Sequence, residues 1–386
     1  MTSVVLDLDD TDEQRAFRSS VRAFAKRELA PRSDEAEATG KYPRELLKKA
    51  ADQGLIGLTL AEELGGLGAG VRYQAIATEE LAYVCAGLAT GLNGLGLNLF
   101  KYASQEQRDR YLVPTLAGEC TGSFAITEPD AGSDVLNMSG RAVRTADGWR
   151  ITANKMYITK APFAEYLFVV VYTDKEARRN GLSAFLVDTS TPGVTVEKMD
   201  KLGHWSMETG MVYLDCELPA EALLGEEGRG LEYVGETLEL GRVNHASRSL
   251  GVARAAYDAA VAYAHDRSTF GRPINQHQAI QFKLARMLTT VRSAALHVRD
   301  AAVRVEQGQT TTGATNMAKL VASEAAVSVA TDAMQVFGGM SYIMETPVQR
   351  FLRDAFLYPV SEGTSEIQLR NIARLTGIVS TTGCGH

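Results

Sequence analysis

Cysteine is scarce in this chain of 386 residues, which contains only Cys85, Cys120, Cys216 and Cys384. The four lie far apart and form no CxxC pair, so the sequence indicates neither a disulfide framework nor a zinc site. The six histidines include no HExxH motif and no pair at ligand spacing with a third ligand nearby. We therefore expect reduced thiols and no metal.

Long hydrophobic runs are also absent, although 45% of the residues are hydrophobic. No run of about 18 apolar residues is present, so we expect no membrane insertion. Residues 1–17 carry acids where a secretory signal needs a basic end and an apolar core, which predicts a cytoplasmic protein. Basic residues are outnumbered, and the net charge of -7 argues against nucleic acid as a partner.

The spacing of apolar residues predicts an α+β chain of three domains. Residues 1–121 are expected to be helical, residues 122–231 to form a compact antiparallel β domain, and residues 232–386 to be helical again. Thr11 is a plausible N-cap, and the first helix is expected to end at Leu29, before Pro31. Helices are predicted over 11–29, 43–55 and 73–92, with a Gly-rich break at 62–70.

The middle domain is predicted from runs rich in Val, Ile, Phe and Tyr, separated by turn signals. Asp147-Gly148 indicates a hairpin, and residues 191–193, Thr-Pro-Gly, indicate another turn. The expected strands are 122–126, 149–159, 165–173, 182–189 and 211–218. Beyond Leu231, apolar residues and small alanines recur at spacings of three and four over 243–264, 280–298 and 317–334, which indicates a helical bundle.

Three local patterns have the composition of functional loops. TEPDAGSD (127–134) follows the first strand, RSTFGRPINQHQ (267–278) joins two long helices, and YPVSEGTSEIQ (358–368) places an acid at a predicted helix start. Taken singly, the first two are ordinary turns. The third is an acid favoured by the helix macrodipole.

In this order, however, the patterns resemble the acyl-CoA dehydrogenase family over nearly the whole chain. The motifs that carry the resemblance are EELGGLG, FAITEPDAGSD, KMYIT, YAHDRSTFGRPI, QVFGGMSY and SEGTSEIQ. The resemblance implies that the C-terminal domain is a four-helix bundle, with FAD held between this bundle and the β domain. It also implies an acyl-CoA or acyl-carrier-protein thioester as substrate, a homotetramer built as a dimer of dimers, and electron-transfer flavoprotein as acceptor.

The resemblance carries roles onto individual residues. The catalytic base is Glu362, because the alternative position before Arg242 holds Gly241. Substrate-side positions are Ser133, Glu239, Arg242, Gly363 and Arg374. The FAD positions are Phe124, Ile126, Thr127, Gly132, Ser133, Tyr157, Ile158, Thr159, Arg267, Phe270, Gln278, Gln335, Gly338, Gly339, Thr364, Ser365 and Glu366; those from Arg267 to Gly339 match positions that reach FAD across a subunit interface.

The chemistry explains why such a chain needs Glu362. The α-proton of a thioester is weakly acidic, so its removal requires a positioned base and stabilisation of the enolate charge. A carboxylate gains basicity when a bound acyl chain excludes water. By resemblance, the backbone N–H of Glu362 and a ribityl hydroxyl of the flavin polarise the thioester carbonyl.

Several positions depart from the family pattern and leave the substrate open. Ser361 replaces a common aromatic residue, Tyr157 replaces a tryptophan, and His204-Trp205 replaces a frequent arginine. The last change makes a carrier-protein thioester an alternative to acyl-CoA. Lys101 and Tyr102, near the segment that often floors the acyl pocket, weaken any prediction of a long alkyl chain.

Three other functions compete with this interpretation of the sequence. A nicotinamide-dependent Rossmann enzyme is disfavoured because GGLGAGV lacks the third glycine of GxGxxG and lies between helices. An oxidase or monooxygenase on the same fold stays open, although a retained Glu362 favours dehydrogenation. A non-catalytic thioester-binding protein is disfavoured by the presence of both the base and the FAD positions.

Overall fold

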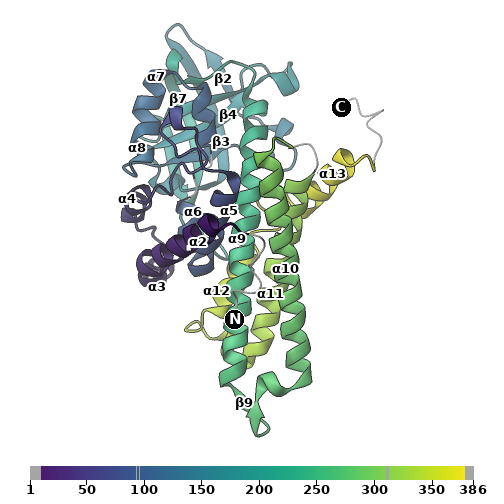
Figure 1. Ribbon diagram of the computed structural model, residues 1–386. Helices are drawn as coiled ribbons and strands as arrows, with labels where there is room; N and C mark the ends of the chain where they lie inside the picture. Colours follow the sequence, from purple (N-terminus) through teal and green to yellow (C-terminus); the bar gives the residue numbers. More distant parts are fainter. Residues whose placement is uncertain (1–9, 93, 95, 310–312, 379–386) are drawn as a thin grey trace.

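The computed structural model describes residues 10–92, 94, 96–309 and 313–378 (Figure 1). The N-terminal helices and the β-sheet form the broad upper part of the molecule, and three long C-terminal helices run beside them and extend below. The predicted order of helical, β and helical domains is confirmed. Cys384 lies outside the described residues.

The N-terminal domain begins with a capped helix, as predicted. The Thr11 side chain accepts the Gln14 N–H, and the Gln14 side chain accepts the Thr11 N–H. The helical path does not end before Pro31 as predicted, because α3 starts at Ala30, directly after a π-helical segment. Pro31 therefore lies in the first turn of α3, where a backbone N–H has no intrahelical acceptor and a proline is tolerated. The elements are α2 (Asp12–Phe24), η1 (Ala25–Leu29), α3 (Ala30–Thr39), α4 (Glu45–Ala51), α5 (Val71–Val84), α6 (Ala86–Gly91), α7 (Gln105–Gln107) and α8 (Val113–Leu116).

The middle domain is a sheet with strand order β6-β7-β3-β2-β4-β5-β8. Strand β1 lies off this path and pairs with β4. Its strands are β1 (Gly122–Ala125), β2 (Arg141–Arg144), β3 (Gly148–Thr159), β4 (Tyr166–Tyr172), β5 (Leu182–Asp188), β6 (Val194–Lys198), β7 (Thr209–Pro219) and β8 (Leu223–Leu224). The hairpin at Asp147-Gly148 and the turn before β6 are confirmed. The sheet is not wholly antiparallel, since β1 returns to β4 by a long connection and pairs with it in parallel.

Over its described residues, the C-terminal domain contains three long α-helices and two shorter ones. They are α9 (Gly230–Asp266), α10 (Gln278–Glu306), α11 (Ala314–Phe337), α12 (Val348–Ala355) and α13 (Ser365–Leu375). Alanines on α9 such as Ala246, Ala253 and Ala260 are fully buried, and α5 packs against α9 from the N-terminal side. The small β9–β10 hairpin (Ser268–Thr269 and Arg272–Pro273) forms the far tip, as Figure 1 shows.

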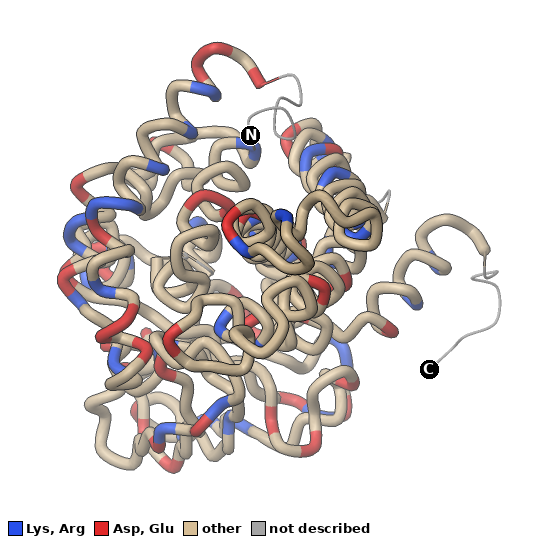
Figure 2. Tube along the Cα trace, turned by 90° about the horizontal axis from the view of Figure 1, so that it is seen from below, with Lys and Arg blue, Asp and Glu red and all other residues tan. Residues whose placement is uncertain are grey.

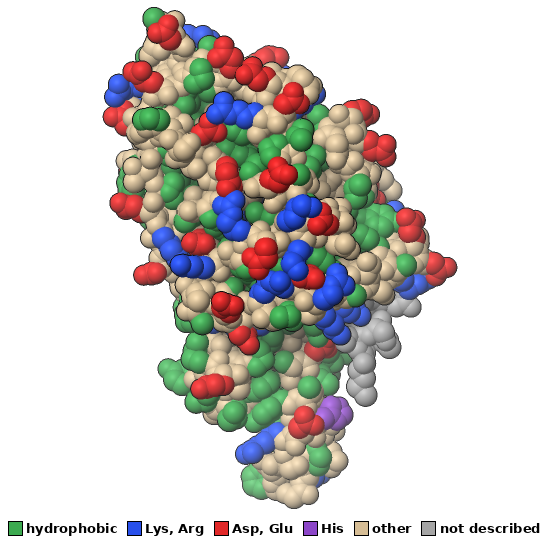
Figure 3. All heavy atoms as spheres, turned by 90° about the vertical axis from the view of Figure 1, so that its left-hand side faces the viewer, with side chains coloured by type: hydrophobic (Ala, Val, Ile, Leu, Met, Phe, Trp, Pro, Cys, Tyr) green, Lys and Arg blue, Asp and Glu red, His purple; other side chains and the backbone are tan. Residues whose placement is uncertain are grey.

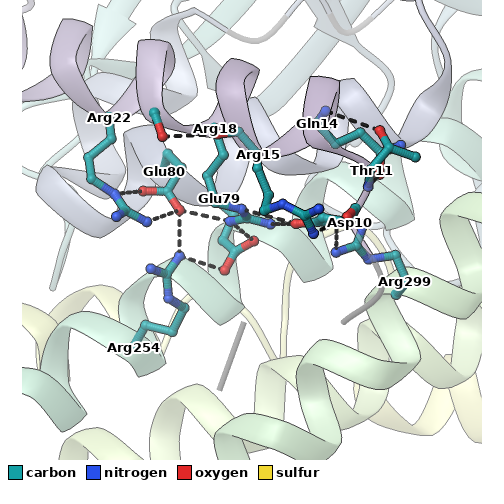
Figure 4. Close-up of polar contacts among 11 residues, drawn as sticks. Asp10, Thr11, Gln14, Arg15, Arg18, Arg22, Glu79, Glu80, Arg254 and Arg299 are labelled. Atoms are coloured by element: carbon teal, nitrogen blue, oxygen red, sulfur yellow. Dashed lines mark hydrogen bonds and ion pairs between the residues drawn. The ribbon is translucent and has the colours of Figure 1, made fainter. Parts of the chain in front are cut away.

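A network of ion pairs connects the first helix to the last domain (Figure 4). Arg254 on α9 lies 2.6 Å from Glu79 and 2.9 Å from Glu80, both on α5. Arg18 on α2 lies 3.0 Å and 2.8 Å from the same two acids. Arg22 pairs with Glu80, and Asp10 pairs with Arg18 and with Arg299 of α10. Glu80 therefore lies where three segments meet.

The surface is charged in the upper part and more apolar below. Lys, Arg, Asp and Glu are interspersed around the body in Figure 2. Apolar side chains gather on the narrow lower part in Figure 3, where the C-terminal helices extend beyond the rest. Helix α13 stands away from the body in Figures 1 and 2. Within the described ranges, no helix has both the length and the apolar character needed to span a bilayer.

Candidate active site

Glu362 lies in the turn that connects α12 to α13, two residues before the N-cap Thr364. It is therefore outside the first turn of α13, and its side chain turns inward with 16% exposure. Its φ of 52° is in the left-handed region, which a residue with a Cβ rarely adopts. Such strain persists only where the surrounding contacts impose it, and it is frequent at functional sites.

The carboxylate of Glu362 contacts two buried side chains of α9. Its Oε1 lies 3.1 Å from Nη2 of Arg248 and 3.5 Å from Nδ1 of His245. Nε2 of His245 lies 3.1 Å from the Tyr358 carbonyl and therefore carries a proton, and Nδ1 lies 3.4 Å from Nη2 of Arg248. Oε2 of Glu362 has no hydrogen-bond partner among the described residues.

These neighbours determine the charge of Glu362. Burial by itself raises the pKa of the carboxyl, but His245, Arg248 and Lys319 outweigh burial and leave the pKa below its usual value. Burial lowers the pKa of His245, while the charge of Glu362 acts in the opposite direction. His245, Arg248 and Lys319 therefore together favour the ionised form of Glu362.

The turn around Glu362 is held by hydrogen bonds from side chains to its backbone carbonyls. Nζ of Lys319 donates to the Gly363 carbonyl at 2.7 Å, and Nε2 of Gln368 donates to the same oxygen at 3.0 Å. The Thr364 side chain accepts the Ile367 N–H and caps α13. The N–H of Glu362, by contrast, meets no acceptor in the described part of the chain.

The predicted substrate-side residues do not all meet at this turn. Arg242 pairs with Glu239 at 2.8 Å, Thr315 donates to Glu239, and the charge of Arg242 acts on Lys319 beside Glu362. Arg374 is exposed at the end of α13, and Ser133 is exposed on a loop of the β domain. One chain thus brings together the Glu362 and Arg242 parts of the predicted site and leaves the others apart.

The predicted FAD positions of the β domain lie next to one another along one edge. The Met156 N–H donates to the Thr127 carbonyl at 2.8 Å, and the Ser123 hydroxyl donates to the Thr159 carbonyl at 2.9 Å. Gly132 and Ser133 are exposed on the following loop, Phe124 and Ile126 are half-buried, and the Ile158 side chain is buried in the sheet. Ile158 can therefore offer a ligand only its backbone.

Tyr157 occupies an irregular position in this edge. The pairing of β3 with β7 shifts between Lys155 and Ile158, and Tyr157 has a φ of 62°. The bulge turns the Tyr157 ring out of the sheet, where it is 61% exposed. An exposed aromatic ring on a strained bulge is a suitable wall for a flat ligand.

The remaining predicted FAD positions lie at three other places. Phe270, which is 97% exposed, belongs with Arg267 and Gln278 to the tip around β9 and β10. Gln335, Gly338 and Gly339 are exposed at the end of α11. Thr364 and Ser365 are half-buried and Glu366 is exposed, all at the start of α13. Figure 1 places the β9 tip at the opposite end of the molecule from the sheet.

Sequence reasoning did not identify Arg248 or His245. Both interrupt a stretch of α9 in which every residue from Val243 to Ala256 is buried. Charged side chains are almost never fully buried unless they are paired. An arginine among the seam alanines was therefore the signal that could have found them.

The helical, β and helical order, with a strained turn that directs a carboxylate inward, agrees with the class that the sequence resembles, the acyl-thioester dehydrogenases. The chain matches three family descriptions in sequence: the N-terminal domain of acyl-CoA dehydrogenase over residues 11–119, its middle domain over 123–216 and its C-terminal domain over 228–376. The chain belongs to the acyl-CoA dehydrogenase family. It is an oxidoreductase of CH–CH groups that dehydrogenates acyl-CoA.

Individual relatives are similar in sequence to this chain over nearly their whole length. The chain is 38% identical to the probable acyl-CoA dehydrogenase YngJ of Bacillus subtilis, covering 96% of this chain and 99% of that one. It is also 38% identical to the mitochondrial short-chain specific acyl-CoA dehydrogenase of Mus musculus, covering 95% and 90%. These values concern proteins to which the chain is similar.

Solved structures share the fold. Butyryl-CoA dehydrogenase of Megasphaera elsdenii matches with a TM-score of 0.90 and 35% identity, covering 96% of this chain and 99% of that one. A glutaryl-CoA dehydrogenase of Mycobacterium smegmatis, solved in complex with FADH2, matches with a TM-score of 0.91 and 28% identity, covering 97% and 98%.

Proposed function

We propose that Glu362 is the base that removes the α-proton of a bound acyl thioester in this enzyme. The observation that carries the proposal is its carboxylate, which is ionised, turned inward by a strained backbone and unpaired at Oε2. An acceptor site for a proton is therefore present without rearrangement of the turn. The unpaired Glu362 N–H is suited to polarise the thioester carbonyl, which stabilises the charge of the enolate.

FAD is the proposed cofactor, and when bound it supplies the acceptor for the β-hydride. The residues fit a flat, phosphate-bearing group: the Tyr157 ring is exposed beside the Thr127 loop, and open space surrounds the positions of Gly132, Gly338 and Gly339. A Cβ atom added at any of these three glycines would meet no atom within 4 Å, so a ligand can approach their backbone. We infer non-covalent binding.

The proposed FAD site requires a second copy of the chain. Phe270 and the end of α11 are exposed, and they lie far from Tyr157 within one chain. Near them, Met340, Tyr342 and Ile343 are also exposed, which is unusual for large apolar side chains unless another surface covers them. A homotetramer, built as a dimer of dimers, brings the tip of one copy to the β edge of another.

The carrier and acceptor follow from family resemblance alone. Family membership gives acyl-CoA as the carrier, and acyl-carrier protein is the proposed alternative carrier because His204-Trp205 replaces a frequent arginine. Electron-transfer flavoprotein is the proposed acceptor. The cytoplasmic location remains a prediction from residues 1–17.

Anaerobic mixing of the purified yellow protein with a panel of acyl-CoA and acyl-carrier thioesters tests the function. We expect at least one thioester to bleach the flavin, with slow reoxidation by oxygen and fast reoxidation by electron-transfer flavoprotein. Rapid reoxidation by oxygen would favour the oxidase alternative. A panel in which no thioester bleaches the flavin contradicts the proposal.

A further inference from the structure

Arg248 is a buried cation that uses only one end of its guanidinium. The residue is 4% exposed. Nη2 contacts both Glu362 and His245, whereas Nη1 is buried and has no hydrogen-bond partner within the described ranges. Arginine usually binds a buried carboxylate with two parallel N–H groups. The pair with Glu362 is therefore incomplete on both sides, since Oε2 of Glu362 is unpaired as well.

Other buried polar groups beside Arg248 are also unpaired. Neither ring nitrogen of His204 has a partner in the described part of the chain, and the same holds for the Tyr358 hydroxyl. The Tyr358 ring touches His204 and His245 edge-on, with centroids 5.6 Å and 5.1 Å apart. His204 also has a positive φ of 51°. The unused hydrogen-bonding groups thus belong to one contiguous cluster next to the candidate base.

The charge of this cluster favours an anion. Arg248 and Lys319 are cations, and Glu362 is the carboxylate that faces them. His204 is neutral, because burial first and the charge of Arg248 next lower its pKa to about 3. Asp354 lies behind His204, accepts its backbone N–H at 2.6 Å and is influenced by Arg350 and Arg353. Once Glu362 takes up a proton, the cluster has an uncompensated positive charge.

We propose that Arg248 binds a carboxylate carried by the acyl chain of the substrate, so that this enzyme prefers the monothioester of a short dicarboxylic acid. The inference rests on the proposed role of Glu362 and names the substrate class. Glu362 has to reach the α-carbon, and Nη2 of Arg248 lies only 3.1 Å from its carboxylate. The second carboxylate of the substrate must therefore follow the α-carbon after few bonds, which excludes a long chain.

Arg248 then favours substrates with a carboxylated acyl chain and disfavours substrates with an apolar one. Arg248 is one of the groups that lower the pKa of Glu362, so a substrate carboxylate that draws the guanidinium away from Glu362 increases the proton affinity of the base. An apolar acyl chain leaves Arg248 on Glu362 and packs against unpaired N–H groups. Discrimination against the wrong substrate by unpaired buried polar groups is a strong source of specificity.

The test compares butyryl-CoA with the CoA monothioesters of succinate and glutarate, using the flavin-loaded enzyme and an Arg248→Met variant. In the wild type we expect faster flavin reduction by a carboxylated thioester. In R248M the ratio of kcat/KM for carboxylated over apolar thioester should fall by on the order of 10²-fold, the scale for loss of a buried charged contact. Arg179→Met, on an exposed turn between β4 and β5, is the matched control and should keep the wild-type ratio.

Binding is measured separately from turnover. In a Glu362→Gln background, calorimetry should show that R248M weakens binding of the carboxylated thioesters more than binding of butyryl-CoA. If R248M does not fold, Arg248→Lys keeps the charge without the planar fork and should lower the ratio by a smaller factor. Equal losses for both substrate types in every readout would mean that Arg248 only positions Glu362, and would overturn the inference.

The possible failures can be told apart. If apolar thioesters bleach the flavin as fast as carboxylated ones and R248M leaves the ratio unchanged, this inference fails while the proposed function stands. If no thioester of either type bleaches the flavin, both fail.

Discussion

Nζ of Lys155 lies 2.8 Å from Oε1 of Glu128, and both side chains are almost completely buried. Lys155 also donates to the carbonyls of Ile126 and Val170, while Glu128 accepts the N–H groups of Ser139 and Gly140. The pair joins the Thr127 loop to the bulged strand β3. The exposed edge proposed for FAD is therefore fixed from beneath by one ion pair.

Lys155→Met should destabilise the protein and disturb that edge. Removing one partner leaves the carboxylate of Glu128 buried and unpaired, which costs about 3–5 kcal/mol of the free energy of unfolding. Urea denaturation checks the stability, and the ratio of flavin to protein after purification should fall. Arg150→Met, on the same strand in an exposed pair with Asp215, is the control and should change stability by about 1 kcal/mol or less. Equal effects of the two variants would contradict the role of the buried pair.

Glu362→Gln should abolish chemistry and preserve binding. The amide keeps the size and much of the hydrogen bonding of the side chain but cannot accept the α-proton. Rapid mixing should show flavin reduction slowed by ~10²–10⁴-fold or more, with a thioester still perturbing the flavin spectrum. The control is Glu119→Gln, an exposed acid before β1. Bleaching at the wild-type rate in E362Q would remove Glu362 from the mechanism.

Glu80 should make the fold sensitive to acid. Burial raises its pKa, but Arg254, Arg22 and Arg18 outweigh burial and lower the pKa from 4.5 to about 2. The unfolded carboxyl binds its proton first as the pH falls, so this stabilisation is complete above about pH 4.5 and lost towards pH 2. The gap in unfolding free energy between wild type and Glu80→Gln should be roughly 3 kcal/mol at pH 7 and shrink across that window. Chemical denaturation at several pH values measures it, with exposed Glu217→Gln as control.

Asp354 should give the opposite pH dependence. Burial, followed by the charge of Glu37, raises its pKa from 3.8 to about 7. The folded protein therefore holds a proton that the unfolded chain releases, and stability falls as the pH rises from about 4 to about 7. Asp354→Asn keeps an oxygen for the His204 N–H and cannot ionise. Its melting temperature relative to wild type should rise across this window, and a constant difference would contradict the assignment.

Arg267→Ala should lower flavin occupancy without unfolding the chain. The residue is exposed at the tip of the bundle, where it precedes β9, and the proposed tetramer brings it to the FAD of another copy. The ratio of flavin to protein reports occupancy, light scattering reports assembly, and Arg179→Ala serves as control. A fully flavinated monomer in the wild type would exclude the shared site.

Much of the fold could be predicted because local patterns determine it. Strand β4 is a continuous apolar run, all of it buried, and the Thr11 cap has its partner three residues away. Strands β2 and β6 were missed because both are short and most of their residues are exposed or half-buried, so their few apolar residues give only a weak strand signal. The helix end before Pro31 was wrong because proline is permitted in the first turn of the continuing helix.

The site was predictable only where a motif covers it. The segment around Glu362 is marked by its own sequence, but the Arg248 that contacts it lies 114 residues away. Helical spacing identifies the buried seam of α9 without revealing which side chain meets Arg248. The strained φ of Glu362 and of Tyr157 is likewise imposed by tertiary contacts, since local sequence disfavours it.

The ion-pair network at Glu80 can be completed only late in the synthesis of the chain. Arg254 follows its partner Glu79 by 175 residues, and the whole β domain lies between them. A ribosome that adds about 5–20 residues per second needs roughly 10 to 35 s to cover that distance. During this interval helix α5 has emerged with its acids, but the arginine of α9 that pairs with them does not yet exist. Arg18 and Arg22 of α2 are then the partners available to Glu79 and Glu80, and the ion pairs that attach these helices to α9 can form only after the β domain has been made.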